Sequence, residues 1–403
     1  MSKLKPVTVS ESLPLTRHAA AFLATANLPG VAFADMRRMI RKELDEDHIA
    51  IPGDTPRRLI LCINGGLLGV RLSNADMTVF IVATDDRRKL SAYRADAVEH
   101  IGAAFPDVAD IIRWSDGDSA GDFPLNFQFL EVKSVAQIGK TFLRVTLQAE
   151  DLLGFGVEAI HFIVVLPSQG FEPEWPELAP NGSVNWPTGV AAPHKPAYTA
   201  RRVEFSANTL AMDVFIHDGG RITVWAKGLI AGTETRTTIG IIGPGGVGMI
   251  SAEKVLVGSD ETGFPPVTRL IDNLLSGACA EVYLEAENGE SCGYPMPQRE
   301  GVVLHWLSRT NGETASEAVI NVLDDHKDAV VWVAGERHSA KRVRDVAKGQ
   351  GRAKCCLRFP KTRNSEAAFG TALTFRDIAN ALRRMPLACN PNNSILVVIK
   401  NVN

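Results

Sequence analysis

The sequence predicts a multidomain α/β protein in which an antiparallel β-barrel is preceded by a small α+β domain and followed by a parallel α/β domain. Three observations support this prediction. A chain of 403 residues is longer than one hydrophobic core usually accommodates, so two or three domains are expected. Between about 125 and 250, apolar residues alternate with period two, which is typical of antiparallel strands. After about 253, strand-like and helix-like segments alternate, which predicts a parallel sheet covered by helices.

The composition is that of an ordinary globular protein, with 45% hydrophobic and 22% charged residues. The formal net charge of −3 gives no reason to expect nucleic acid or an acidic membrane as the main partner. No run of apolar residues reaches the ~18 needed to span a bilayer, and Ser10-Glu11-Ser12 interrupts the place where an apolar signal core would have to run. We therefore expect a cytoplasmic protein that neither binds nucleic acid nor inserts into a membrane.

The six cysteines are scattered, without a Cys-x-x-Cys or a paired Cys/His spacing, so the sequence predicts no zinc site. Cys355 and Cys356 are adjacent and have two interpretations. They form either a redox couple or two small apolar side chains on a strand, and their strand-like neighbours favour the second interpretation.

Residues 1 to about 118 have the pattern of a small α+β unit. Helical spacing of apolar residues predicts helices, Asn64-Gly65-Gly66 predicts a turn between two strands, and the turn-rich stretch Ser115–Asp122 predicts a linker. The expected order is helix Leu15–Ala26, helix Ala32–Leu44, strands within Arg58–Val70, strand Thr78–Ala83, helix Arg87–Ala104 and closing strand Ile111–Trp114.

The central segment supplies five strand candidates separated by turn signals, a spacing that suggests an antiparallel barrel or sandwich. One loop, Pro167–Pro196, is rich in Pro, Gly and Trp. Loops of this length inside a compact domain are usually functional or mobile. The expected strands are Phe142–Leu147, His161–Leu166, Arg202–Phe205, Ala211–His217 and Thr237–Ile242.

The last part of the chain alternates between strands and helices, and a sheet of this kind binds its ligands beyond the carboxyl ends of its strands. We therefore expect domains at 1–118, 125–250 and 251–360, and a C-terminal extension of unassigned role at 361–403. The expected strands are Lys254–Gly258, Ala280–Ala286, Val302–Leu307 and Ala329–Ala334, and the expected helices are Pro265–Leu275, Glu313–Leu323 and Ala340–Lys348.

Three motifs in the barrel segment carry candidate binding chemistry. In Lys195-Pro196-Ala197-Tyr198-Thr199-Ala200-Arg201, alternate positions on one strand offer a phenol, a hydroxyl and a cation. Asp213–Gly220 leads into Thr223-Val224-Trp225-Ala226, where the start of a helix offers backbone N–H groups to a phosphate. Gly243-Pro244-Gly245-Gly246 closes the segment.

Three further motifs stand at expected strand ends of the α/β segment, namely Gly258–Pro265, Leu304–Arg309 and Val331–Glu336. In this order, over about 125–350, the six motifs resemble the siderophore-interacting protein branch of the ferredoxin–NADP reductase superfamily. The first is similar to the superfamily's flavin-binding Arg-x-Tyr-Ser/Thr motif, and the fourth to the branch's Gly-Asp-Glu-Thr-Ala-x-Pro loop.

The chain departs from the family pattern at a few positions. Pro196 stands where the superfamily usually has its Arg, and Lys195 is the candidate replacement one step earlier. Val224 and Ile163 stand where Arg and Lys are frequent, and the usual aromatic C-terminal segment is absent. These departures bear on how tightly a flavin is retained.

The resemblance implies an FAD-dependent ferric-siderophore reductase with a flavin-binding β-barrel, a Rossmann-like NAD(P)-binding domain and an N-terminal accessory domain. It implies that electrons pass from NADPH or NADH, or from ferredoxin, through FAD to the Fe(III) of a siderophore, which releases Fe(II). Such a reaction needs no catalytic acid or base and no protein metal ligand. The residues implied to bind cofactors are Lys195, Tyr198, Thr199, Arg201, Asp213, Phe215, His217, Thr223, Trp225, Gly243 and Gly245 on the flavin side, and Asp260, Glu261, Thr262, Arg309, Gly335 and Glu336 on the nicotinamide side.

These residues also have structural interpretations. Tyr198 and Trp225 would be core aromatics, and Asp260 with Glu261 a charge pair at a helix start. His217 and Arg309 would be ordinary strand-end side chains. The order of the motifs favours the binding interpretation for Tyr198 and Trp225, while Arg309 beside Ser308 suits a 2′-phosphate and so favours NADPH over NADH.

Gly243–Gly248 satisfies the G-x-G-x-x-G dinucleotide fingerprint, which requires a strand before it and a helix at its end. Met249–Glu253 is too short for that helix before the next strand begins. We therefore interpret the glycines as an interdomain loop in which the backbone approaches a ligand.

Arg337–Arg363 contains ten Lys or Arg and one acid, Asp345. Such a stretch is usually a solvated helix face, but beside a redox site it could steer an anionic ferric siderophore. Nucleic acid is a third option, which the overall charge disfavours. The candidate steering residues are Arg337, Lys341, Arg344 and Lys348.

Two other functional classes compete with the siderophore reductase. One is a general flavin or ferric reductase, whose rate would not depend on the identity of the chelate. The other is a non-catalytic siderophore-binding or adaptor protein descended from a reductase.

Overall fold

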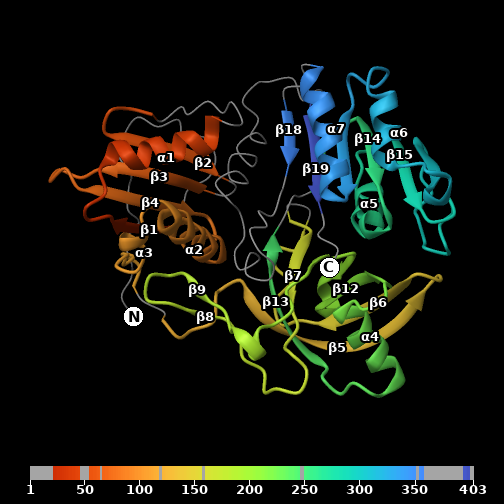
Figure 1. The fold of residues 1–403 in the computed structure, drawn as a ribbon, viewed down its shortest axis with the longest axis horizontal. Coiled ribbons are helices and arrows are strands. Elements are labelled where there is room, and N and C mark those ends of the chain that lie inside the picture. The colour runs from red at the N-terminus through yellow and green to blue at the C-terminus, as the bar shows by residue number, and fades with distance from the viewer. Residues whose placement is uncertain are drawn as a thin grey trace. The chain divides into compact units, whose positions relative to one another are not determined.

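A computed structural model describes residues 21–45, 54–63, 66–117, 120–156, 159–245, 249–350, 354–357 and 394–399 (Figure 1). The contacts of the chain divide it into two compact units. The first holds the described residues up to Asn126 together with Trp175–Pro187, and the second holds Phe127–Glu174 and the described residues from Thr188 on. The four domain boundaries expected from the sequence stay predictions, and most of 361–403 lies outside the described residues.

The first unit contains a four-stranded antiparallel sheet in the order β1-β4-β3-β2. Three helices accompany it, and α2 begins at an N-cap, Asp86, whose side chain accepts a hydrogen bond from the backbone N–H of Arg88. The elements are β1 (Phe22–Asn27), α1 (Phe33–Asp45), β2 (Arg58–Ile63), β3 (Gly66–Leu72), β4 (Thr78–Thr84), α2 (Arg87–Ala104) and α3 (Pro106–Ala109).

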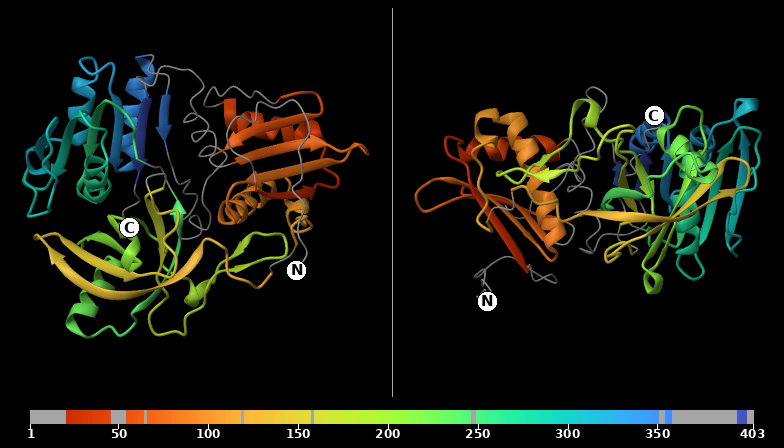
Figure 2. Two further views of the ribbon diagram at one scale, coloured as in Figure 1. Left: turned by 180° about the vertical axis from the view of Figure 1, so that it is seen from behind. Right: turned by 90° about the horizontal axis from the view of Figure 1, so that it is seen from below.

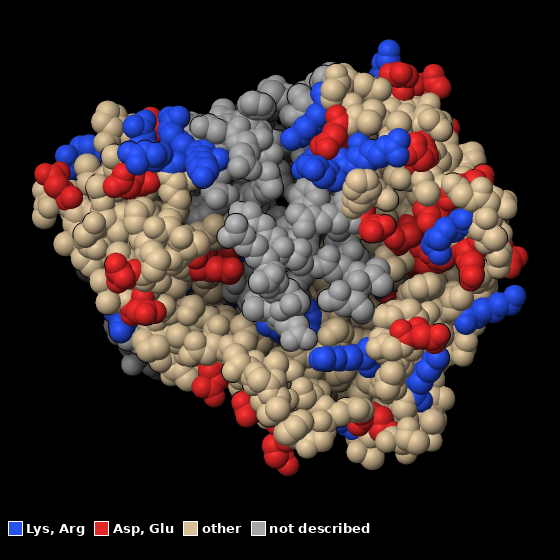
Figure 3. All heavy atoms as spheres, viewed as in Figure 1, with Lys and Arg blue, Asp and Glu red and all other residues tan. Residues whose placement is uncertain are grey.

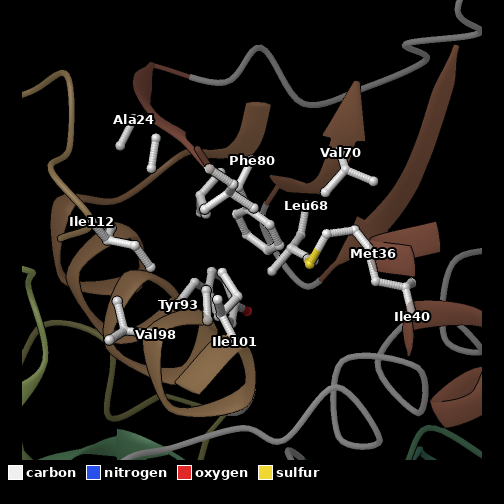
Figure 4. Packing of buried hydrophobic residues seen from close by; sticks show 14 of the residues in the cluster. Ala24, Met36, Ile40, Leu68, Val70, Phe80, Tyr93, Val98, Ile101 and Ile112 are labelled. Atoms are coloured by element: carbon white, nitrogen blue, oxygen red, sulfur yellow. The ribbon is translucent and has the colours of Figure 1, made fainter. Parts of the chain in front are cut away.

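One face of this sheet packs against α1 and α2 to form the core of the unit (Figure 4). Phe80 of β4 lies at its centre and is fully buried, as are Met36 of α1 and Ile101 of α2. Because apolar side chains at helical spacing meet those at alternate strand positions, the core joins elements that are distant in sequence.

Two expectations for this unit are wrong. The expected helix Leu15–Ala26 is a strand over its described part, because β1 pairs with β4 from Phe22↔Thr84 to Asn27↔Val79 and tertiary pairing outweighs local helical spacing. The expected closing strand Ile111–Trp114 is a turn that follows α3, and only Trp114 forms a bridge, with Ala26. The other expected strands and helices are confirmed.

The first unit also includes a hairpin from the long loop of the barrel segment, formed by β8 (Glu177–Leu178) and β9 (Val184–Asn185). Figures 1 and 2 show it in yellow-green beside the orange helices of this unit. The chain therefore leaves the barrel segment after Glu174 and returns to it at Thr188.

The second unit begins with a seven-stranded antiparallel sheet in the order β10-β7-β13-β5-β6-β12-β11. The backbone N–H of Arg201 donates to Ala211 of β12 and that of Ala200 to Ile160, so the β10–β11 segment links the two ends of the sheet into a barrel. The elements are β5 (Phe127–Ile138), β6 (Phe142–Gln148), β7 (His161–Val165), β10 (Ala197–Thr199), β11 (Arg202–Glu204), β12 (Thr209–Phe215), α4 (Arg221–Ala231) and β13 (Thr238–Gly245).

The five strands expected in the barrel are confirmed, whereas β5 was not expected. A register shift between Val132 and Ser134 interrupts the period-two pattern of β5, which explains why its sequence does not indicate one continuous strand.

The second unit ends with a six-stranded parallel sheet in the order β16-β15-β14-β17-β19-β18. Helix α5 packs on one face, and α6 with α7 on the other. The strands and helices expected between Lys254 and Lys348 are confirmed. The elements are β14 (Lys254–Ser259), α5 (Phe264–Asp272), β15 (Cys279–Ala286), β16 (Val302–Ser308), α6 (Ala315–Val322), β17 (Val330–Gly335), α7 (Arg337–Gly349), β18 (Lys354–Leu357) and β19 (Ser394–Ile399).

The first strand of this sheet, β14, lies between β15 and β17, so the chain reverses direction across the sheet at this point. In open parallel sheets such a switch point is where ligands bind, at the carboxyl ends of the strands. Residues 249–253, before β14, form no helix, in agreement with the expectation that the preceding glycines are not a dinucleotide fingerprint. Among the described helices, none is long and apolar enough to cross a membrane.

Candidate cofactor sites

The motif around Tyr198 forms the short strand β10, which pairs with β7 at the edge of the barrel sheet. The hydroxyl of Thr199 is buried and lies 3.1 Å from Nδ1 of His161. Tyr198 is half-buried against the barrel core, opposite Phe162. Burial raises the pKa of the Tyr198 phenol and lowers that of the Lys195 amine to about 8. The motif thus offers a protonated phenol on β10 and, two residues before the strand, an amine with a pKa of about 8.

The glycines at the end of β13 lie on the other side of β7. Gly245 pairs with His161, so His161 stands between Thr199 of β10 and Gly245 of β13. A Cβ at Gly243 would come within 2.8 Å of Cβ of Phe162, whereas a Cβ at Gly245 would meet no atom of the described residues within 4 Å. Gly243 is therefore required for close strand packing, and Gly245 leaves open space beside the motif strand.

The start of α4 is the second candidate binding element of the barrel. Its N-cap is Gly220, which provides no side-chain hydrogen bond. The ring of His217 lies against Gly220, where a Cβ would clash with the ring atom Cε1. The Thr223 hydroxyl in the first turn is buried and has no hydrogen-bond partner among the described residues. Backbone N–H groups of a first helical turn have no intrahelical acceptor, so this end of α4 has the donors that a phosphate needs.

Three other residues of the predicted flavin set lie in packing positions. Trp225 is 2% exposed, packs in the barrel core and donates from Nε1 to the carbonyl oxygen of Arg236. The ring of Phe215 packs against Phe142, with 5.4 Å between the ring centroids. Asp213 is buried, and its carboxylate accepts hydrogen bonds from Arg144 at 2.7 and 2.8 Å and from the Tyr294 hydroxyl at 2.7 Å.

This carboxylate fastens the barrel to the α/β domain. The hydrogen bond with Asp213 raises the pKa of Arg144, and burial together with Asp213 raises that of Tyr294. Tyr294 also packs against Phe142 of β6 and Phe264 of α5. Both oxygens of Asp213 are thus occupied by groups of this chain.

Arg201 and Arg269 meet where β10 ends. Arg201 pairs with Asp272 of α5 at 3.3 Å, and its buried Nε has no partner among the described residues. Arg269 of α5 is buried and donates to the carbonyl oxygens of Ala200 and Phe155. Burial, with a contribution from Arg201, lowers the pKa of Arg269 to about 10. Two guanidinium groups therefore stand beside the motif strand.

The carboxyl ends of β14 and β17 meet at the switch point. Asp260 follows β14, and its side chain accepts hydrogen bonds from the backbone N–H and the hydroxyl of Thr262. A Cβ at Gly335, the last residue of β17, would come within 3.1 Å of Oδ2 of Asp260. Burial raises the pKa of Asp260. Glu336 is exposed at the start of α7, next to Gly335.

The ends of β15 and β16 are joined by an ion-pair cluster. Arg309 pairs with Glu261 and, at 2.8 Å from Nε, with Glu285. Glu261 also accepts a hydrogen bond from the backbone N–H of Glu287. Although burial opposes it, the two carboxylates raise the pKa of Arg309. A 2′-phosphate that binds Arg309 has to compete with these carboxylates.

The four candidate steering residues of α7 differ in exposure. Lys341 and Lys348 are exposed, whereas the side chain of Arg344 is 12% exposed and pairs with Asp345 at 3.2 Å. The side chain of Arg337 lies outside the described residues. Figure 3 shows basic side chains gathered over α7, with acidic ones among them.

Sequence reasoning missed Arg269, Glu285, Arg144 and Tyr294. Arg269 occurs in the last turn of a helix, where a basic residue is normally solvated, and only the fold shows that it is buried. In the described part of the chain, no three His, Cys, Asp or Glu side chains are placed to hold a metal ion.

Two family models match this chain between residues 131 and 355. The siderophore-interacting FAD-binding domain matches residues 131–248, and the siderophore-interacting protein model matches residues 252–355. These two segments are therefore similar to the two domains of siderophore-interacting proteins. The resemblance that the motifs indicated over about 125–350 is thereby confirmed.

Curated relatives cover the same segment of the chain. The ferric vibriobactin reductase ViuB of Vibrio cholerae serotype O1 is 26% identical over 239 residues, which are 57% of this chain and 85% of the relative. The NADPH-dependent ferric-chelate reductase of Escherichia coli K12 is 27% identical over 229 residues, 54% and 85% of the two chains. Among solved structures, the siderophore-interacting protein SipS from Aeromonas hydrophila is similar, with a TM-score of 0.45, 20% identity and coverage of 55% and 85%.

The residues of the FAD-binding domain fit the cofactor. The Thr223 hydroxyl, which has no hydrogen-bond partner in the described part of the chain, lies at a helix start without a side-chain cap and suits a phosphate. The space beside Gly245 leaves a flat ring room to approach β13. Lys195 and Arg201 supply positive charge on either side of Tyr198 and suit the negative charge of a dinucleotide.

Proposed function

We propose that this protein is a cytoplasmic FAD-dependent reductase of ferric siderophores that uses NADPH or NADH as electron donor. The observation that carries the proposal is the start of α4, where the buried Thr223 hydroxyl, which has no partner among the described residues, and the His217 ring lie at the first-turn N–H groups. That element lies within the segment that matches the FAD-binding domain. The names of the two curated relatives, both ferric reductases, support the same activity.

The proposal gives the barrel residues binding roles. His217 and Thr223 hold the cofactor's phosphates at the start of α4, and Tyr198 and Thr199 bind its ring. Lys195 and Arg201 supply cationic contacts, and Gly243 with Gly245 lets the backbone approach. We assign Asp213, Phe215 and Trp225 to packing, because their polar atoms or rings are engaged within the chain.

The carboxyl edge of the parallel sheet is the proposed place for the nicotinamide nucleotide. Asp260, Thr262 and Gly335 shape the switch point between β14 and β17. Glu261 holds Arg309 in position, so that Arg309 faces the nucleotide at the end of β16. Glu336 lies next to Gly335 at the start of α7.

When bound, FAD supplies the conversion of a two-electron donor into the one-electron steps that Fe(III) requires. The protein's own part is to place donor, cofactor and chelate, and for this the joint formed by Arg144, Asp213 and Tyr294 keeps the barrel and the α/β domain in a fixed orientation. Fe(II) is held weakly by hard oxygen donors, so reduction releases the iron without hydrolysis of the siderophore.

The test is an FAD titration followed by a reductase assay with two chemically different ferric chelates and an Fe(II) trap. The proposal predicts a yellow holoprotein and a rate that depends on the chelate. A rate that is equal for all chelates indicates a general ferric reductase. Chelate binding without any Fe(II), from NADPH, NADH or reduced ferredoxin, indicates the adaptor protein.

A further inference from the structure

The long loop of the barrel, Pro167–Pro196, carries its β8–β9 hairpin in the N-terminal unit. We propose that the N-terminal unit is an intramolecular clasp that holds this loop and thereby positions the flavin-binding strand β10. The positioning residues are Trp114, Arg94 and Asn181. The inference rests on the proposed function, because it concerns the strand that binds FAD.

The hairpin is joined to the N-terminal unit by buried hydrogen bonds. Nε1 of Trp114 donates to the carbonyl oxygen of Asn181 at 2.7 Å, and the Asn181 amide donates to that of Ala109 at 3.0 Å. Leu178 exchanges backbone hydrogen bonds with Gly121 and Asp122 at 2.9 and 2.8 Å. Trp114 is 5% exposed and Asn181 is 7% exposed, so water does not compete for these bonds.

The tip of the hairpin fits only a glycine. Gly182 has φ +82°, and a Cβ there would come within 3.0 Å of Nη2 of Arg94 and of Nε1 of Trp114. Arg94 is itself fixed, since it pairs with Asp116 at 2.6 Å and its guanidinium lies 5.3 Å from the centre of the Trp114 ring. The hairpin is therefore seated against groups that cannot easily move aside.

The two ends of the loop are held on the barrel. Leu166 bridges His194, and the hydroxyl of Ser168 donates to the carbonyl oxygen of Ala192 at 2.8 Å. Arg236, which follows α4, donates to the carbonyl oxygens of Pro167 and Ser168, both at 3.2 Å. Anchoring the middle of the loop as well shortens the stretches that are free to move to a few residues on each side.

Strand β10 is the element that the anchored loop is expected to stabilise most. It has three residues and, among the described strands, pairs only with β7. When a short edge strand after a long loop becomes ordered, the loop loses conformational entropy, which opposes the ordering of the strand. A loop that is already held lowers that cost, so Lys195, Tyr198 and Thr199 stay in place for the cofactor. This gives the N-terminal unit a role in cofactor binding.

The test compares two substitutions in the same loop. Gly182→Ala adds a methyl group at the crowded left-handed position, and Gly189→Ala adds one at another left-handed position, φ +63°, where no atom of the described residues lies within 4 Å. Trp114→Phe removes the Nε1 donor but keeps a ring beside Arg94. We expect Gly182→Ala and Trp114→Phe to speed amide exchange across 188–199 and to weaken FAD binding by roughly fivefold or more, with Gly189→Ala close to the parent.

The turnover number at saturating FAD should change little, because the clasp acts on the population of ordered β10 and not on the chemistry. Faster exchange confined to 175–187, with the FAD dissociation constant unchanged, would overturn the proposal. If Gly182→Ala does not fold, Trp114→Phe decides the question by the same two measurements. If the parent binds no FAD, the proposed function fails, and exchange in 188–199 alone still decides whether the loop is clasped.

Discussion

At the scale of single residues, Tyr198 is the side chain whose role is most open to direct measurement. Tyr198→Ala should weaken FAD binding by about 1–3 kcal/mol, the value of an aromatic stacking contact, while the fold stays intact. Tyr198→Phe is the matched control, because it keeps the ring and removes only the hydroxyl. Fluorescence titration with FAD measures both variants, and an alanine variant that binds as well as the parent would remove Tyr198 from the site.

Lys195 is expected to make FAD binding depend on pH. Burial lowers the pKa of its amine to about 8, so the ammonium loses its charge as pH rises through that value, and attraction for an anionic cofactor falls with it. We expect affinity for FAD to decline above pH 8 in the parent. In Lys195→Arg the decline should be absent, since the guanidinium stays charged, and in Lys195→Gln affinity should be low at every pH. A Gln variant with the parent's profile would exclude Lys195.

Arg309 is expected to set the preference between the two nicotinamide donors. Arg309→Ala should lower kcat/KM for NADPH more than for NADH by roughly 10- to 100-fold, because hydrogen bonds between charged groups contribute about 1.5–3 kcal/mol. Glu285→Gln should raise kcat/KM for NADPH, since one competing carboxylate is removed. Equal losses for both donors in Arg309→Ala would show that Arg309 only bridges strand ends.

At the scale of elements, α7 is expected to attract an anionic ferric chelate through Lys341 and Lys348, which are exposed and seven residues apart. Neutralising both to Gln should lower the second-order rate with the chelate several-fold at low salt, and the defect should vanish as the Debye length falls below about 8–10 Å. Lys133→Gln with Lys227→Gln, an equal change of exposed charge on the barrel, is the control. A salt-independent loss in kcat would instead place a lysine in the site.

The elements also show where sequence patterns are sufficient. The strands and helices from Lys254 to Lys348 were predictable because each is buried on a regular face, whereas β5 was hidden by its register shift and β1 by pairing with a strand about 50 residues away. The motifs placed Tyr198 on a strand and Asp260 after a strand end, where the structure has them, and their binding roles stay predictions. The burial of Arg269 and the engagement of Asp213 depend on contacts between domains, which no local pattern encodes.

At the scale of the whole molecule, the second unit contains a barrel and a parallel sheet, which the buried contact of Asp213 with Arg144 and Tyr294 joins. The N-terminal unit includes a hairpin that belongs, in sequence, to a loop of the barrel. That this hairpin packs in the N-terminal unit could not be predicted from the sequence, because residues 175–187 and Trp114 come together only in the folded chain. The sequence pattern predicted the long loop Pro167–Pro196 but not the unit against which its hairpin packs.

The central claim is that electrons pass from a nicotinamide nucleotide through bound FAD to a ferric siderophore. The most direct measurement is an anaerobic rapid-mixing experiment on the holoprotein that follows the flavin band near ~450 nm, a property of the cofactor. NADPH or NADH should bleach the band, and subsequent mixing with a ferric siderophore should restore it and yield two Fe(II) for each flavin reoxidised. A flavin that neither nicotinamide reduces, or a reduced flavin that the ferric siderophore does not reoxidise, would contradict the account.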